Sequence, residues 1–127
     1  MPFARRDLER LAEIVTLAAD AEIVPRFRKL DGSAVREKTS ALDLVTDADE
    51  GAEAHMRAAV AKAFPKALFV GEESVEKDRS LLAGITAADL AIIVDPVDGT
   101  NNFAWGLPLF GVILAVVARG ETIAGLI

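Results

Sequence analysis

Apolar residues recur at three- and four-residue spacing over residues 3–30, which predicts an amphipathic helix. The recurring residues are Leu8, Leu11, Ala12, Val15, Ala18, Ala19 and Ile23. Because Pro25 lacks a backbone donor, we expect this helix to kink near Ala21. The same spacing predicts a second helix from residue 47 or 48 to about residue 63, and Pro65 prevents it from continuing. Its buried stripe is expected to comprise Ala52, Met56, Ala59, Val60 and Ala63.

Short apolar runs in the rest of the chain predict β-strands, at residues 67–70, 90–95, 109–118 and 122–127. A short Arg-Gly-Glu turn separates the last two, so these strands must pair antiparallel. The remaining segments are expected to be extended chain at 34–46 with an exposed loop at 38–41, a polar turn at 71–74, and a loop or short helix at 78–89. This order predicts a mixed α/β (α+β) fold, with two N-terminal helices covering one face of a largely antiparallel sheet.

Composition narrows the class of protein. Of the 127 residues, 52% are hydrophobic and the mean hydropathy is +0.33, which favours a packed core over a disordered chain. The net charge of -6 and the pI near 4.8 argue against a nucleic-acid surface, which would be basic. The absence of Cys excludes a disulfide framework and a zinc–thiolate site. It also fits a reducing compartment, and we expect a cytoplasmic protein.

The uncharged stretch at residues 103–118 raises the question of a membrane span. It is shorter than the ~20 residues that a spanning helix needs, and Gly106, Pro108 and Gly111 interrupt it. We therefore expect a buried strand and no membrane association. The N-terminus becomes charged within its first residues, so it lacks the apolar core of a signal peptide.

Acidic residues gather where predicted strands end and predicted helices begin. They lie within residues 43–49, at Glu72 and Glu73, and at Asp95 and Asp98. Two carboxylates as close as Asp95 and Asp98 repel each other, and burying them is costly unless a cation lies between them. Carboxylates are ligands for Mg²⁺, Mn²⁺ or Ca²⁺, and with no Cys and one His in the chain zinc is disfavoured.

The residues that follow the two Asp predict an anion site. Gly99 lets the backbone approach a ligand closely, and Thr100 is expected to open a short helix whose N–H groups point at an anion. A divalent metal beside an anion site is the combination that phosphate chemistry requires, because metals offset phosphate charge and activate a bound water.

Three motifs then occur in order: "K....DLVTDAD" at 38–49, "GEES" at 71–74 and "DPVDGTNNF" at 95–103. Together they resemble the inositol monophosphatase family of Mg²⁺-dependent, lithium-sensitive phosphatases. The resemblance implies the layered α-β-α-β-α sugar-phosphatase fold. It also implies two or three bound Mg²⁺ ions, with Mn²⁺ as an alternative, a small phosphorylated alcohol as substrate, and a homodimer.

Roles for individual residues follow from this resemblance. Glu72 and Asp95 would hold the first metal with the carbonyl of Val97, and Asp95 would bridge to a second metal that Asp98 also holds. The catalytic residues would be Asp49, Thr100 and Glu72, with Asp49 and Thr100 orienting the attacking water. The N–H groups of Gly99 and Thr100 would bind the phosphate, and Lys38 falls where the family has a mobile loop near the metals.

The sequence departs from the family pattern at its end. A further metal-binding Asp belongs to a later family motif of the "WDxAAG" kind, and the 127 residues end, inside an apolar run, before any such motif. We therefore expect residues 1–127 to be the N-terminal portion of an inositol monophosphatase-like domain whose C-terminal portion is absent from the sequence. These residues alone are expected to be inactive.

The expected reaction of the complete protein is hydrolysis of a small alcohol phosphate by metal-activated water. The sequence "GTNNF" at 99–103 fits the inositol phosphatase branch, so myo-inositol 1-phosphate is the first substrate. Two alternatives stay open: a histidinol-phosphatase of the same family, and a non-catalytic binding or scaffold module.

Simpler structural roles compete with each assignment. Asp95 and Asp98 would serve as turn and cap residues, Asp49 as a charge at a helix N-terminus, and Lys38 as a solvated loop charge. Supporting or surface roles are expected for the other polar residues, namely Glu73 and Ser74 near the site, Asp43 as a cap or a hydrogen-bond partner of the backbone, Asp47 and Glu50 as solvated helix-start charges, and His55 at the surface or boundary. Trp105 and Phe110 are expected in the core or in a subunit contact.

Overall fold

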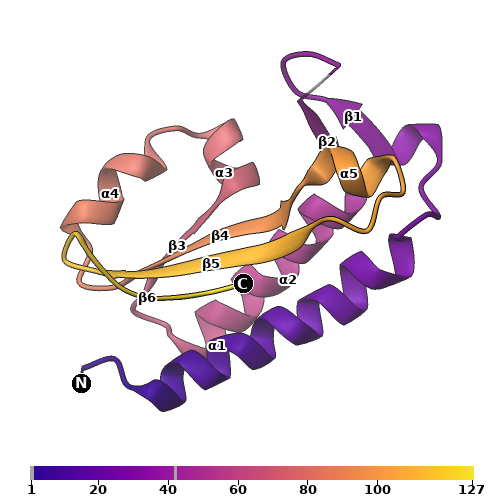
Figure 1. Ribbon diagram of the computed structural model, residues 1–127. Helices are drawn as coiled ribbons and strands as arrows, with labels where there is room; N and C mark the ends of the chain where they lie inside the picture. Colours follow the sequence, from indigo (N-terminus) through magenta and orange to yellow (C-terminus); the bar gives the residue numbers. More distant parts are fainter. Residues whose placement is uncertain (1, 42) are drawn as a thin grey trace.

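The computed structural model describes residues 2–41 and 43–127 (Figure 1). The helices are α1 (Arg5–Ala18), α2 (Asp47–Ala63), α3 (Glu72–Lys77), α4 (Leu81–Ala87) and α5 (Thr100–Ala104), with a π-helical turn at Ala19–Ile23 and 3-10 turns at Val24–Arg26 and Gly32–Ala34. The strands are β1 (Val35–Glu37), β2 (Leu44–Thr46), β3 (Leu68–Gly71), β4 (Ala91–Asp98), β5 (Gly111–Ala118) and β6 (Glu121–Leu126).

Four of the strands form one mixed sheet in the order β3-β4-β5-β6. β3 runs parallel to β4, whereas the β4–β5 and β5–β6 pairs are antiparallel, so the predicted antiparallel character is confirmed for two of the three pairs. The β5–β6 turn places Arg119 at φ 47° and Gly120 at φ 82°, the two positive values that a tight hairpin turn needs. β1 and β2 form a separate antiparallel hairpin.

Helices cover both sides of the main sheet. α1 and α2 lie together under one face, as predicted, while α3 and α4 lie on the other side (Figure 1). The core lies between the first face and the two long helices. Its fully buried members include Leu11 and Ala18 of the first helical segment, Met56 and Val60 of α2, Ile92 and Val94 of β4, and Leu114 and Val116 of β5.

The first predicted helix is interrupted where Pro25 was expected to disturb it. Regular α-helix ends at Ala18, and the wider π-helical turn that follows includes Ala21. Helical structure then stops at Arg26, not at residue 30, because the backbone of Phe27 is extended. Along the buried stripe Ala12 is exposed, a correction to the expected pattern, since Leu11, Ile14, Val15 and Ala18 complete the core-facing stripe without it.

The second predicted helix, at 47–63, is confirmed as α2. Two other predicted boundaries are wrong. Residues 71–74 are not a polar turn, because α3 begins at Glu72, directly after β3. The strand predicted to end at Asp95 continues to Asp98. Between residues 78 and 89 the short-helix alternative is confirmed by α4.

An aromatic cluster anchors the segment after β4. Phe103 of α5 is fully buried and contacts the rings of Phe27 and Phe110, with centroids 5.8 and 4.9 Å apart. Phe27 and Phe110 contact each other at 5.2 Å. The cluster therefore ties α5 to the end of the first helical segment and to the start of β5.

In the described residues no helix is long and apolar enough to cross a membrane.

Replacing Phe103 with Ala should lower the free energy of unfolding by about 3–5 kcal/mol, because it removes a buried ring and leaves a cavity. Urea unfolding followed by circular dichroism measures this change. Leu107→Ala is the matched control, since Leu107 is 50% exposed just after α5. Equal unfolding free energies for the two variants would contradict the assignment of Phe103 to the core.

Candidate metal and phosphate site

The parallel pairing of β3 and β4 brings Glu72 next to Asp95. In the register of these strands Gly71 lies opposite Val94, so the residues that follow, Glu72 and Asp95, lie level with each other. The carboxyl ends of adjacent parallel strands are where open α/β sheets place their ligands. The sequence motifs at 71–74 and 95–103 thus meet at one edge of the sheet.

A β-bulge in β4 then places Asp98 on the same side as Asp95. Asp95 pairs with Ile113 and Asp98 with Gly111, so three steps along β4 match two along β5. Successive residues of a strand face opposite sides of the sheet, so Ile113 and Gly111, two positions apart, share a face of β5. Their partners on β4, Asp95 and Asp98, lie on that same face. Pro96 occupies the bulge, one of the few positions that tolerate proline within a sheet.

Burial and neighbouring acidic groups disfavour the charged forms of Glu72 and Asp95. Burial, together with the hydrogen bond and charge of Asp95, raises the pKa of Glu72 to about 7. Burial and the charges of Asp98 and Asp49 raise the pKa of Asp95, against the opposing hydrogen bond with Glu72. Such mutual repulsion is relieved by a cation that binds them together.

Asp95 also has an unsatisfied oxygen. Its Oδ1 is buried and has no hydrogen-bond partner among the described residues. A buried acceptor without a partner is costly, and in native proteins it usually marks an absent ion or water. The chemistry of this donor set therefore fits a hard divalent cation.

The carboxylates do not form a complete cage. Across residues 2–41 and 43–127, no group of three or more His, Cys, Asp or Glu side chains is arranged to hold a metal ion. Mg²⁺ does not need such a cage, because it commonly binds through one or two carboxylates and completes its shell with waters and substrate phosphate.

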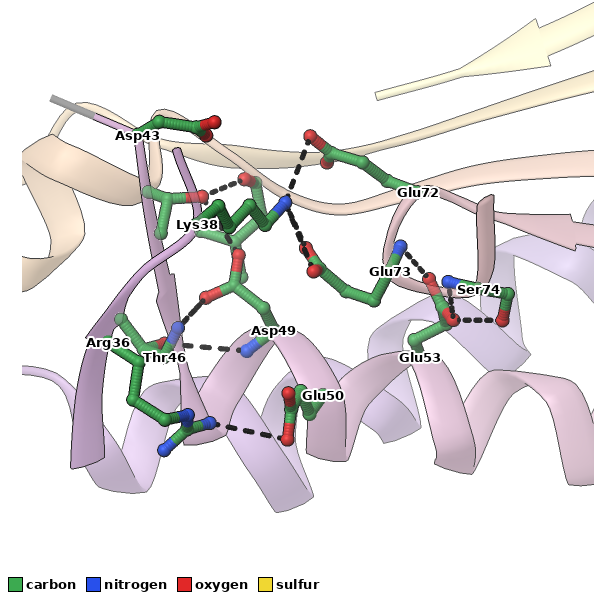
Figure 2. A network of polar contacts seen from close by, with 12 residues as sticks. Arg36, Lys38, Asp43, Thr46, Asp49, Glu50, Glu53, Glu72, Glu73 and Ser74 are labelled. Carbon is green, nitrogen blue, oxygen red and sulfur yellow. Dashed lines mark hydrogen bonds and ion pairs between the residues drawn. The ribbon is translucent and has the colours of Figure 1, made fainter. Parts of the chain in front are cut away.

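Lys38 reaches into the site from the loop after β1. Its Nζ lies 3.1 Å from an oxygen of Glu73 and 3.8 Å from one of Glu72, and its side chain is 8% exposed (Figure 2). Burial disfavours its charge, but the hydrogen bond and charge of Glu73 and the charge of Glu72 outweigh this and raise the pKa of Lys38. The interpretation of Lys38 as a solvated loop charge is therefore wrong.

Asp49 joins α2 to α5. Its Oδ2 accepts hydrogen bonds from the N–H and hydroxyl of Thr46, at 2.9 and 2.6 Å, while its own N–H donates to the Thr46 hydroxyl. This reciprocal pair is a capping box at the start of α2. Its Oδ1 accepts from the Thr100 hydroxyl at 2.8 Å. Asp49 thus has the structural role expected at the start of α2 and contacts Thr100, and burial raises its pKa against those hydrogen bonds.

The turn between β4 and α5 depends on Gly99. Its φ of 87° lies in the left-handed region, and a Cβ there would approach the Leu109 carbonyl oxygen to 2.7 Å, so a side chain is excluded. The Thr100 hydroxyl lies 2.9 Å from the Val97 carbonyl oxygen, the group expected to face a metal. A hydroxyl carries one proton, so Asp49 and Val97 share this donor.

Glu53 is the main polar residue that the sequence analysis missed. It is 3% exposed on α2, and its carboxylate accepts hydrogen bonds from the N–H groups of Glu73 and Ser74, at 2.8 and 3.0 Å (Figure 2). A signal existed, since Glu53 lies on the stripe of Ala52 and Met56 and one turn after Asp49. The supporting roles expected of Glu73 and Ser74 agree with these contacts.

Some of the remaining predictions for polar and aromatic residues agree with the structure, and others do not. Asp43 accepts a hydrogen bond from the Thr39 hydroxyl, and its own backbone groups bond to residues 38 and 40 and close the loop. Asp47 and Glu50 pair with Arg36, at 2.8 and 3.2 Å, and are exposed as expected. His55 is half-buried at the boundary. Phe110 packs in the aromatic cluster, but Trp105 is 60% exposed, so a core position is wrong for it.

Comparison with known proteins places this arrangement in context. A sequence model of the inositol monophosphatase family matches residues 7–127. Inositol monophosphatase 1 from Bos taurus is 32% identical over 114 residues, which cover 89% of this chain and 40% of the bovine protein. The Nus factor SuhB of Pseudomonas aeruginosa is 39% identical over 96 residues, which cover 75% of this chain and 33% of that protein. The chain therefore spans less than half the length of each relative.

The fold agrees with the sequence match. The solved structure of an IMPase from Thermotoga maritima superposes with a TM-score of 0.74 at 28% identity, over 96% of this chain and 43% of its own. This likeness confirms the layered fold that the sequence motifs implied. Since the family pattern extends over residues 7–127 and the fold is shared, the chain belongs to the inositol monophosphatase family.

Proposed function

We propose that the protein is a Mg²⁺-dependent phosphomonoesterase, with residues 1–127 supplying the N-terminal portion of its domain. Membership of a phosphatase family supports a hydrolase. The observation that carries the proposal is the buried, unpartnered Oδ1 of Asp95 beside the raised-pKa carboxyl of Glu72. A cation would satisfy these groups, and a cation at the end of two adjacent strands is suited to phosphate binding.

The proposed ligands follow from this arrangement. Glu72, Asp95 and the carbonyl of Val97 would hold the first Mg²⁺, and Asp95 with Asp98 the second, with Mn²⁺ as a substitute. The shared face of Asp95 and Asp98 on β4 supports the bridging role. When bound, Mg²⁺ supplies charge neutralisation at the phosphate and a bound water with a lowered pKa.

Thr100 and Asp49 would position the attacking water. The hydrogen bond from the Thr100 hydroxyl to Asp49 Oδ1 leaves the lone pairs of the hydroxyl oxygen facing away from Asp49. A water can then donate a proton to Thr100 Oγ1 while the Thr100 proton moves toward Asp49. The N–H groups of Gly99 and Thr100 would hold the phosphate during this step.

myo-Inositol 1-phosphate is the proposed substrate, and histidinol phosphate is the alternative within the family. A homodimer, lithium sensitivity and a cytoplasmic location are further proposals, carried by the family alone. A non-catalytic binding module is a second candidate, favoured by the similarity to a protein named as a Nus factor. Calorimetry separates the two candidates, because full-length protein that binds no Mg²⁺ would favour the binding module.

In the full-length protein, Asp98→Asn should lower kcat at least about 100-fold, because it removes a ligand charge worth several kcal/mol at the transition state. Phosphate release measures the rate, and circular dichroism should detect little loss of folding, since Asp98 is exposed. Asp89→Asn is the matched control, an exposed Asp shortly before the same strand. Wild-type turnover by the Asp98 variant would contradict the ligand assignment.

A phosphate-release panel tests the substrate. With saturating Mg²⁺, full-length protein should hydrolyse myo-inositol 1-phosphate at a higher kcat/KM than histidinol phosphate or β-glycerophosphate. Equal rates on inositol phosphate and β-glycerophosphate, together with a far higher rate on histidinol phosphate, would replace the proposed substrate with the alternative.

Without metal, stability should fall as the pH rises from about 4.5 to about 7. Burial raises the pKa of Glu72 and of Glu73 from 4.5 to about 7, in Glu73 against its ion pair with Lys38. Between these values the folded state binds more protons than the unfolded chain, so the free energy of unfolding decreases with pH. The raised pKa values of Asp49 and Asp95 act in the same direction.

Thermal unfolding in EDTA measures this effect, and the melting temperature should fall by several degrees over that range. Saturating Mg²⁺ should restore it, because metal ligands bind in the charged form. Glu72→Gln should weaken the pH dependence, whereas Glu76→Gln, at an exposed position of α3, should leave it unchanged. A melting temperature that rises with pH in EDTA would contradict the raised pKa values of these carboxyl groups.

A further inference from the structure

A buried carboxylate lies next to the candidate site without belonging to it. Glu53 is 3% exposed on α2, and its carboxylate lies against Glu73 and Ser74 in the first turn of α3 (Figure 2). It accepts four hydrogen bonds: from the N–H groups of Glu73 and Ser74 at 2.8 and 3.0 Å, from the Ser74 hydroxyl at 2.6 Å, and from Arg57 at 2.8 Å. Charged acceptors with several partners form the stronger hydrogen bonds in proteins.

These contacts replace a missing helix cap. The residue before α3 is Gly71, which has no side chain to accept hydrogen bonds from the first turn. The carboxylate of Glu53 takes that role from a different helix. The start of α3 is thereby fixed to α2, and α2 also carries Asp49 one turn earlier.

Gly71 is shaped for this contact. A Cβ at Gly71 would overlap the carboxyl group of Glu53, which approaches the backbone where a side chain would otherwise lie. Gly71 has a negative φ of -104°, so glycine is not required there by backbone conformation. Close approach of the Glu53 carboxylate is the physical reason for glycine at this position.

The first turn of α3 carries Glu72 and Glu73, whose side chains face Asp95 and Lys38 respectively. A shift of this turn would move Glu72 away from Asp95. We propose that Glu53 is a positioning residue, which holds the start of α3 so that Glu72 and Asp95 together present their oxygens to a divalent cation. The inference rests on the proposed function, because it assigns Glu53 a part in metal binding at the same site.

Calorimetric titration of metal-free, full-length protein with Mg²⁺ provides the test. Glu53→Gln keeps the shape of the side chain. It replaces one carboxylate oxygen, which accepts hydrogen bonds from N–H groups, with an NH₂ group, which can only donate. The Mg²⁺ dissociation constant should rise about 10- to 100-fold, the usual cost of losing a group that orients a metal ligand. Glu50→Gln is the matched control, because Glu50 lies on the same helix and pairs with Arg36, not with α3.

A second variant guards against loss of folding in the first. Gly71→Ala changes no polar group but displaces the Glu53 carboxylate, so it should weaken Mg²⁺ binding to a similar extent. The variant that carries both changes should bind Mg²⁺ almost as tightly as the single variant with the lower Mg²⁺ affinity, because both changes break the same contact between Glu53 and the start of α3. Thermal unfolding of the metal-free proteins shows which variants are folded at the titration temperature.

The outcomes separate this inference from the proposed function. The inference is overturned if either folded variant, Glu53→Gln or Gly71→Ala, has a Mg²⁺ dissociation constant within twofold of the wild-type value. Glu53 would then have a structural role only, even if the melting temperature of the variant is lower. Wild-type protein that binds no Mg²⁺ overturns the proposed function, and the inference with it. The inference is also overturned if Glu50→Gln weakens Mg²⁺ binding as much as Glu53→Gln does, because the loss would then follow from the change in net charge.

Discussion

Repulsion among carboxylates at the ends of β3 and β4 is the constraint on which the rest of this structure depends. Asp95 lies beside Glu72 at the ends of these strands, and the bulge places Asp98 on the same face of β4 as Asp95. Left alone, such groups would move apart or take up protons. Rigid elements hold them in place, namely the sheet register, the bulge in β4 and the buried start of α3. The protein thereby holds an unfavourable charge arrangement, which the proposed cation would relieve.

α2 is the helix whose side chains hold the segments around these carboxylates in place. Asp49 and Glu53 lie one turn apart on its buried side and act on different halves of the site. Asp49 holds Thr100 on the β4–α5 turn, and Glu53 holds the first turn of α3. Both are buried acids that face hydrogen-bond donors, which is the condition under which a core tolerates charge. Lys38 then supplies the opposing positive charge from the hairpin side.

The parts predictable from sequence are those set by local pattern. The period of apolar residues predicted α2 from residue 47 or 48 to about residue 63, and the motifs at 71–74 and 95–103 contain the carboxylates that the sheet brings together. The bulge was not predictable in this way, because a regular strand would put Asp95 and Asp98 on opposite faces. Pro96 alone hinted at it. Glu53 was passed over because apolar periodicity ignores an acid within the buried stripe, whose partners lie in another element.

The hydrogen bonds that build the site also determine when it can exist during folding. Glu53 bonds to a residue 20 positions away, Lys38 to one 35 away, and Asp49 to one 51 away. Each such contact requires closure of a long loop, and the parallel β3–β4 pair closes only after the chain has passed through α3 and α4. Non-local contacts of this kind carry a loop-closure cost that a local helix does not. The ligand arrangement is therefore a property of the assembled sheet, and no single helix or hairpin of the chain can carry it.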